Sequence, residues 1–182
     1  MKCLSVRQPW ADAIIKGIPV PAGKIFKDVE NRSKAYGHRG KTLIHAPQKF
    51  DHDGWEWIME TFGCVLKNPE EYQIGGFIGE ITIWGNTIDS KSKWAAPGQN
   101  NLLLKDPVEL PFVEIKGQLG FWNEPTCRVC GCTTYHACEG GCYWVEKDLC
   151  SKCKEQCQTC KWSNSEHCKD CFCNELYEGK VW

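Results

Sequence analysis

Cysteines crowd the last third of the chain and limit what that part can fold into. Twelve of the fourteen cysteines lie between Cys127 and Cys173. Most come as pairs with two residues between them, and one tight turn can then direct both sulfurs at a single ion. Because this segment is poor in aliphatic residues, we expect metal ligation to supply the folding free energy that an apolar core would otherwise provide.

The paired cysteines form two sets that differ in spacing. Nineteen residues separate the pairs of the first set and seven those of the second. Four thiolates fill a tetrahedral shell, so each set predicts a structural site for Zn²⁺. The first set is Cys127, Cys130, Cys150 and Cys153, and the second is Cys157, Cys160, Cys168 and Cys171. A third ion is an alternative, held by Cys132, Cys138, Cys142 and one more ligand, and the residues left for that place are Cys173, His136 and His167. The division of these ligands among two or three zinc ions stays open.

Two other uses of the cysteines compete with zinc. An iron–sulfur cluster also takes four thiolates, but only Cys127, Cys130 and Cys132 approach its closely spaced run. Disulfides require export, and the first residues lack the apolar segment of a secretory signal. The sequence contains no run of eighteen apolar residues of the kind that spans a membrane. We therefore expect a cytoplasmic zinc protein with no membrane partner.

Composition and charge change along the chain. The composition predicts a globular domain at residues 1–123 and a Cys-rich module at residues 124–182. The net charge of −1 gives no overall basic excess of the kind that marks many nucleic-acid-binding proteins. However, residues 2–49 carry ten Lys and Arg against three acids, and residues 50–125 carry five against twelve. One side of the first domain is therefore expected to be cationic.

Sequence patterns predict two helices and five or six strands before residue 123. One helix follows Pro9 and stops at Gly17, and the other covers residues 51–62 and stops at Gly63. Strands are expected at residues 2–6, 27–32, 41–46, 76–84, 101–110 and 117–122, with loops at residues 18–23 and 90–99. Because helices and strands do not alternate, the fold class is α+β, built around a small, mostly antiparallel β-barrel. The tail is expected to be small, irregular and metal-stabilised.

Five segments of the first domain resemble, in order, the ASCH domain family. They are LSVRQPWADAII (4–15), KDVENR (27–32), GKTLIHA (40–46), GFIGE (76–80) and KGQLGFW (116–122). The resemblance implies a PUA-like β-barrel with two flanking helices and a cleft beside the first helix. It also implies that the cleft binds RNA, DNA or a modified base.

The family signature G-x-K-x-x-E-x-R indicates the residues of that cleft. Lys27, Glu30 and Arg32 occupy its charged positions, whereas Ile25 replaces its glycine. We expect Gly17 to take the place of that glycine, with residues 19–26 inserted at the rim of the cleft.

The expected cleft joins cations, an acid and an aromatic ring. Lys27 and Arg32 can contact phosphates, while Glu30 offers an acceptor to a base edge. The same cleft is expected to include Arg7, Gln8, Trp10 and His45, which add a guanidinium, an amide, a stacking face and an imidazole. The alternatives are a structural ion pair of Glu30 with Arg32 or Arg7, and a Trp10 that anchors the core.

The sequence predicts a protein that binds RNA or single-stranded DNA, and two other functions compete with this prediction. Relatives in the resembled family hydrolyse acylated cytidine or cleave RNA, and Lys27 can act as a general base in such a reaction. Glu30, however, stands where those amidohydrolases carry a hydroxyl residue, so binding is preferred. The third reading is an adaptor whose zinc module docks a protein through Tyr143, Trp144 or Trp162.

Overall fold

The computed structural model describes residues 1–158 of the 182-residue chain, and for residues 156–158 only the backbone. The expected ligands Cys160, His167, Cys168, Cys171 and Cys173, together with Trp162, lie outside the described residues, as does the side chain of Cys157. The chain divides into two compact units, Met1–Asn123 and Glu124–Trp182. Each unit is described by itself below.

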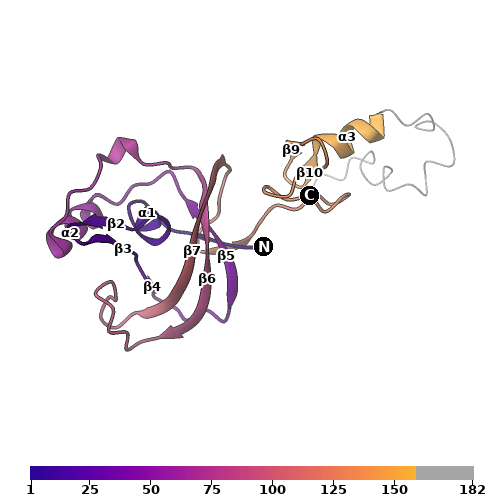
Figure 1. Ribbon diagram of the computed structural model, residues 1–182. Coiled ribbons are helices and arrows are strands. Elements are labelled where there is room, and N and C mark those ends of the chain that lie inside the picture. Colours follow the sequence, from indigo (N-terminus) through magenta and orange to yellow (C-terminus); the bar gives the residue numbers. More distant parts are fainter. Residues whose placement is uncertain (159–182) are drawn as a thin grey trace. The chain divides into compact units, whose positions relative to one another are not determined.

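The first unit contains a curled, mixed sheet of six strands, and it confirms the predicted α+β class (Figure 1). The strands run across the sheet in the order β4-β7-β6-β5-β1-β8. Their bounds are β1 Lys2–Ser5, β4 Val29–Arg32, β5 Gly40–Ala46, β6 Gly76–Thr87, β7 Asn100–Glu114 and β8 Phe121–Asn123. Neighbouring strands are antiparallel except β1 and β5, which pair in parallel. The sheet is thus mostly antiparallel, as predicted.

Irregular pairing between β6 and β7 bends the sheet into a half-barrel. The register between these two strands shifts at three places along β6, and such bulges increase the local bend and twist. Gly79 lies at one of them, where a Cβ atom would stand 2.5 Å from the carbonyl oxygen of Val108 and 2.7 Å from the side chain of Ile15. The absence of a side chain at Gly79 therefore lets the first helix pack closely against the concave face of the sheet.

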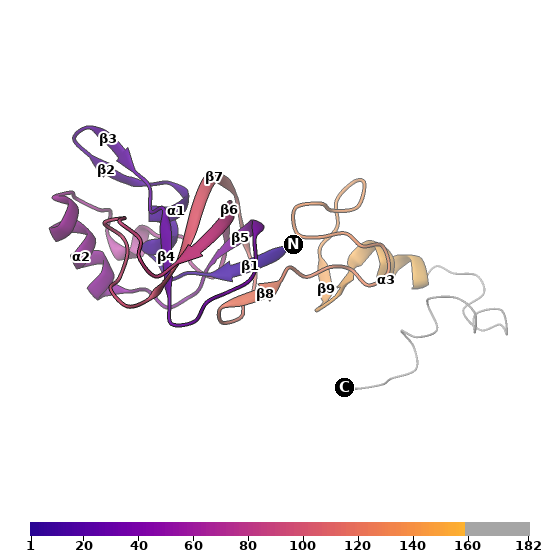
Figure 2. The ribbon, with the colours of Figure 1, turned by 90° about the horizontal axis from the view of Figure 1, so that it is seen from below.

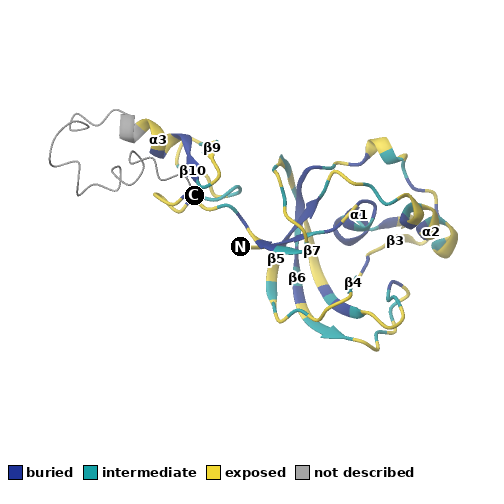
Figure 3. Ribbon diagram, turned by 180° about the vertical axis from the view of Figure 1, so that it is seen from behind, coloured by how far each residue is buried: buried dark blue, intermediate teal, exposed yellow. Residues whose placement is uncertain are grey.

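The first helix, α1 (Trp10–Ile15), is enclosed by the curled sheet and contributes to two apolar clusters. It follows Pro9 and ends before Gly17, as predicted. Every residue from Ala11 to Ile15 is buried (Figure 3). Ile14 and Ile15 pack on the sheet, whereas Ala13 faces the cluster that includes Ile58.

The second helix, α2 (His52–Phe62), begins and ends where the sequence predicts. The side chain of Asp51 accepts a hydrogen bond from the Gly54 amide at 3.1 Å, and Gly63 ends the helix in the left-handed conformation. A 3₁₀ turn, η1 (Pro69–Glu71), follows. Asp51 also accepts a hydrogen bond from the indole Nε1 of Trp10 at 2.8 Å, which ties the start of α2 to α1.

The expected loop at residues 18–23 is instead part of a short hairpin. Strands β2 (Ile18–Val20) and β3 (Gly23–Ile25) pair only with each other (Figure 2). The sequence predicts a loop here because Pro19 cannot donate a hydrogen bond to a neighbouring strand. In a two-stranded ribbon both strands are edges, so the missing donor is tolerated.

The described part of the second unit has little regular structure. It contains β9 (Trp144–Glu146), β10 (Leu149–Cys150) and α3 (Ser151–Gln158). Its buried cluster consists of Cys127, Cys132, Leu149, Cys150 and Cys153, so sulfur occupies the place of an aliphatic core. Among residues 1–158, no helix has both the length and the apolar character to cross a membrane.

The two hydrogen bonds of Asp51 predict a measurable loss of stability on substitution. Asp51→Ala removes the helix cap and the acceptor of the Trp10 indole, so we expect the free energy of unfolding to fall by about 2–3 kcal/mol. Asp51→Asn keeps an acceptor oxygen and should lose less. Urea unfolding followed by tryptophan fluorescence tests this, with Asp53→Ala as the control in the same helical turn. An Asp51→Ala midpoint equal to that of the unsubstituted protein would contradict this role.

Candidate functional site

A cavity of about 780 Å³ opens in the first unit and brings together residues far apart in the sequence. Six of the seven residues expected in the cleft line it, namely Arg7, Trp10, Lys27, Glu30, Arg32 and His45. The volume is within the range of cavities that hold small organic ligands. The cavity is therefore large enough for a nucleoside.

Gln8 does not line this cavity. Its side chain is fully buried and donates hydrogen bonds to Asp12 Oδ1 at 2.7 Å and to the carbonyl oxygen of Gln73 at 3.0 Å. Its amide oxygen accepts from the backbone N–H of Asp12 at 2.9 Å. Gln8 thus fixes the first turn of α1, and its amide is engaged within the protein.

Lys27, Glu30 and Arg32 form a continuous chain of charges at the cavity. Lys27 Nζ lies 2.7 Å from Glu30 Oε2, and Arg32 Nη2 lies 3.0 Å from Glu30 Oε1. The ammonium also donates to the Val29 carbonyl, and the guanidinium donates to the carbonyl oxygen of Ser5 at 2.9 Å. Lys27 precedes β4, and its ammonium reaches the carboxylate of Glu30, three residues later in the chain. Both oxygens of one carboxylate are thus held by cations.

This arrangement changes which cation is available to an external ligand. The Lys27 side chain is only 2% exposed, and its ammonium bonds within the protein. Arg7, in contrast, is exposed at the cavity and makes no ion pair with any described residue. The exposure of Arg32 lies between these two, with 19% of its side chain exposed. Its Nε atom is buried and has no hydrogen-bond partner among residues 1–158. Arg7 is therefore better placed for a phosphate than Lys27.

Trp10 is both a core anchor and part of the cavity wall. Its ring centroid lies 5.6 Å from that of Trp57 and 6.3 Å from that of Trp94, and its indole N–H bonds to Asp51. Lys27 Nζ lies 5.7 Å from the ring centroid. The side chain remains half-buried at the cavity. Its orientation is thus fixed before any ligand enters.

His45 and Ser5 make a hydrogen-bonded wall on adjacent, directly paired strands. His45 Nε2 lies 3.0 Å from the Ile115 carbonyl oxygen, which can only accept, so this nitrogen carries a proton. Nδ1 lies 3.2 Å from Ser5 Oγ, which receives the Trp122 indole N–H at 3.2 Å and donates to the Gln118 carbonyl oxygen at 2.5 Å. Burial lowers the pKa of His45, although its bond to the Ile115 carbonyl acts in the opposite direction. Burial thus favours the neutral form of the imidazole.

The structure adds cavity residues that the sequence did not single out, among them Ser5, Asp51 and Lys116. Ser5 ends β1 and lies between the buried Leu4 and Val6. This alternation of polar and apolar residues is visible in the sequence. Asp51 directly precedes the predicted second helix. Lys116 begins the resembling segment KGQLGFW, but nothing in its local pattern assigns it to the cavity.

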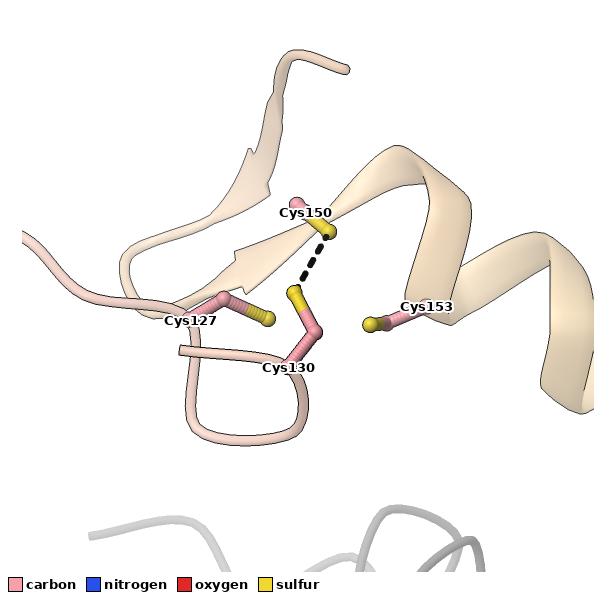
Figure 4. A group of neighbouring side chains, drawn as sticks. All are labelled: Cys127, Cys130, Cys150 and Cys153. Carbon is pink, nitrogen blue, oxygen red and sulfur yellow. Dashed lines mark hydrogen bonds between the residues drawn. The ribbon is translucent and has the colours of Figure 1, made fainter. Parts of the chain in front are cut away.

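In the second unit, the first predicted cysteine set converges on one point (Figure 4). Cys127 and Cys130 come from one loop, Cys150 from the end of β10 and Cys153 from the first turn of α3. The four sulfurs lie within 4.8 Å of one another. These four cysteines can hold a metal ion.

A second group of sulfurs overlaps the first. Cys130, Cys132, Cys138 and Cys150 also have their sulfurs within 4.8 Å of one another. Cys130 and Cys150 belong to both groups. The expected third site on Cys132, Cys138 and Cys142 is thus not separate from the first, and His136 belongs to neither group.

Backbone amides in the turns favour the thiolate form of some of these cysteines. Burial raises the pKa of Cys127, but amide hydrogen bonds from Cys130, Cys150 and Val129 outweigh it, and the net shift is downward. The amide of Cys132 lowers the pKa of Cys130. Gly131 closes this turn in the left-handed conformation, with its N–H bonded to the Cys127 carbonyl at 2.9 Å.

Three further thiols, those of Cys132, Cys138 and Cys153, resist ionisation in the absence of a cation. Burial, followed by the neighbouring thiols, raises the pKa of Cys132 and of Cys153. The Cys130 thiol contributes most to raising the pKa of Cys138, to about 12. A metal ion would supply the positive charge that lets all of these thiols ionise together.

A scan against known protein families and a search of curated proteins both give no match for this chain. Any inference about its function must therefore start from the cavity and from the cysteine groups.

The buried environment of His45 predicts a pH-dependent contribution to stability. Its pKa in the folded state lies below 6.5, the value of an unshifted histidine. Between these two values the unfolded chain binds the proton and the folded protein does not. The contribution of His45 to the free energy of unfolding is therefore fully present above pH 6.5 and is lost as the pH falls toward the folded-state pKa. An NMR titration of the His45 ring should give a midpoint below pH 6.5. A midpoint above that value would contradict the hydrogen-bonding scheme.

Proposed function

We propose that residues 1–123 are an ASCH-like domain with a PUA-like barrel that binds an unpaired base of RNA or single-stranded DNA. The observation that carries this proposal is the cavity of about 780 Å³, in which a carboxylate held by two cations lies with an exposed arginine and a fixed tryptophan. These are the side chains that commonly hold splayed-out bases. The ordered resemblance of five segments to the ASCH family supports the same function.

Glu30 and Arg32 provide the polar contacts that a base edge needs. The Glu30 carboxylate has further lone pairs beside its two cationic partners, because each of its oxygens can accept two hydrogen bonds. Arg32 lines the cavity with 19% of its side chain exposed, and its guanidinium offers a donor there. An acceptor beside a donor matches the alternating pattern on a nucleobase edge. Lys27 acts in this proposal as a positioning residue for Glu30, not as a phosphate contact.

The exposed cations at the cavity provide a modest attraction for the nucleic-acid backbone. Arg7 and Lys116 are exposed, and both line the cavity. Glu114 and Asp51 line it as well and limit its net positive charge. Two phosphate contacts to a single strand give a plot of log affinity against log salt concentration a slope of roughly −1.4. The proposed interaction is therefore weak in electrostatic terms and depends on the base.

Substitution of Arg7 tests this proposal without disturbing the fold. Arg7→Ala should weaken binding of a labelled eight-nucleotide RNA or DNA about tenfold, since one charge-assisted contact is lost. The slope of log affinity against log salt concentration should become half as steep, roughly −0.7, because one phosphate contact remains. Fluorescence anisotropy across a salt series measures both quantities.

Arg39→Ala is the matched control, because Arg39 is an exposed arginine of the same unit that does not line the cavity. Its affinity and salt slope should equal those of the unsubstituted protein. Equal losses in both variants would point to nonspecific attraction, and no binding by the unsubstituted protein would end the proposal.

A hydrolase that uses Lys27 as a general base is the competing function. General-base catalysis requires a neutral amine, whereas Lys27 Nζ donates to the Glu30 carboxylate at 2.7 Å. Nζ also donates to the Val29 carbonyl, so this group is engaged within the protein and is not free to take up a proton from a substrate. The proposal accordingly expects no release of acetate from acylated cytidine and no cleavage of RNA. Turnover that Lys27→Met abolishes, in a variant that still folds, would replace binding by catalysis.

We further propose that the second unit is a zinc-stabilised docking module. Zn²⁺ prefers four thiolates in structural sites, and Cys127, Cys130, Cys150 and Cys153 provide them without an open position for chemistry. Tyr143, 68% exposed in the same unit, offers an aromatic contact to a protein partner.

Metal analysis tests the zinc assignment. Purified protein should be colourless and contain zinc, and a chelator should unfold the second unit while the first unit keeps its circular dichroism. Cys127→Ser should lower the zinc content, whereas Cys64→Ser, in the first unit, should not. Iron with visible absorbance would instead assign an iron–sulfur cluster.

A further inference from the structure

The two overlapping cysteine groups share an edge. Cys127 and Cys153 belong only to the first group, Cys132 and Cys138 belong only to the second, and Cys130 and Cys150 belong to both. Six sulfurs thus make up two groups of four that have Cys130 and Cys150 in common.

The separations between these sulfurs match metal coordination. A tetrahedral ion with metal–sulfur bonds of about 2.3 Å sets its sulfurs about 3.8 Å apart. Cys130 Sγ lies 3.7 Å from Cys150 Sγ and 3.5 Å from Cys138 Sγ, and the latter two lie 3.8 Å apart. These three sulfurs form one face of a coordination tetrahedron, and Cys132 is the remaining member of that group.

We propose that the described cysteines hold two divalent ions in one cluster, in which the thiolates of Cys130 and Cys150 bridge both ions. The proposal rests on the metal site of the second unit described above and is independent of the nucleobase cavity. Cys127 and Cys153 complete the shell of one ion, and Cys132 and Cys138 complete the shell of the other. If the first group held a single ion, the Cys138 sulfur would touch a coordinated thiolate but would bind no metal ion itself.

Cys142 has a different place in this cluster. Its sulfur lies 3.7 Å from Cys132 Sγ and accepts the backbone N–H of Cys138 at 3.4 Å. It belongs to neither group of converging sulfurs. Cys142 therefore supports the loop that carries two ligands, and it offers a cysteine control close to the proposed site.

Cadmium-113 NMR on the full chain can detect a shared thiolate directly. Cd²⁺ replaces Zn²⁺ readily in thiolate sites, and two cadmium ions joined by a bridging sulfur split each other's resonances. The unsubstituted protein should give a pair of mutually coupled resonances. Since this result requires no substitution, it does not depend on the folding of any variant.

Two variants assign the coupled pair to these cysteines. Cys132→Ser/Cys138→Ser should remove the coupling and one equivalent of cadmium, and Cys142→Ser should keep both ions and their coupling. Three outcomes would each overturn the shared cluster. They are uncoupled resonances in the unsubstituted protein, coupling that survives the double substitution, and loss of an ion in Cys142→Ser. Complete failure to bind cadmium or zinc would also overturn the proposed metal site, whereas uncoupled binding would leave that site standing.

Discussion

The carboxylate of Glu30, held between Lys27 and Arg32, connects the parts of the first unit that surround its cavity. Through Arg32 it reaches the backbone of β1, and the amide of Lys27 bonds to Ala13 of α1 at 2.8 Å. Because these charges are largely removed from water, loss of one partner strands the others, at a cost of about 3–5 kcal/mol. The chain of charges therefore has a structural role, and it also places the Glu30 carboxylate at the cavity.

The second unit solves the problem of a small apolar core in another way. Cys127 and Cys150 are nearly fully buried, yet the strands and the helix that carry them are short. The turn at Gly131 directs backbone N–H groups at sulfur, which lowers the pKa of Cys127 and favours the thiolate that a metal ion binds. Folding and metal binding in this unit are thus expected to be a single event.

Local chemistry explains which features the sequence could predict. Pro9, Asp51 and Gly63 mark helix ends through their own backbone or side-chain preferences, so α1 and α2 follow from the sequence. The spacing of Cys127, Cys130, Cys150 and Cys153 likewise predicts a converging set. In contrast, the burial of Lys27 and the overlap of the sulfur groups depend on contacts between distant segments. The β2–β3 hairpin was missed because Pro19 disfavours a strand except at an edge.

Strand β1 pairs on one side with β5 and on the other with β8, more than a hundred residues later in the chain. Its partner Trp122 packs in a stacked arrangement on Phe77, with ring centroids 5.5 Å apart. Contacts of such wide sequence separation slow folding, since a long loop must close before they form. During synthesis β1 would remain an open strand edge until Phe121–Asn123 leaves the ribosome, and during that interval it is exposed to pairing with other chains.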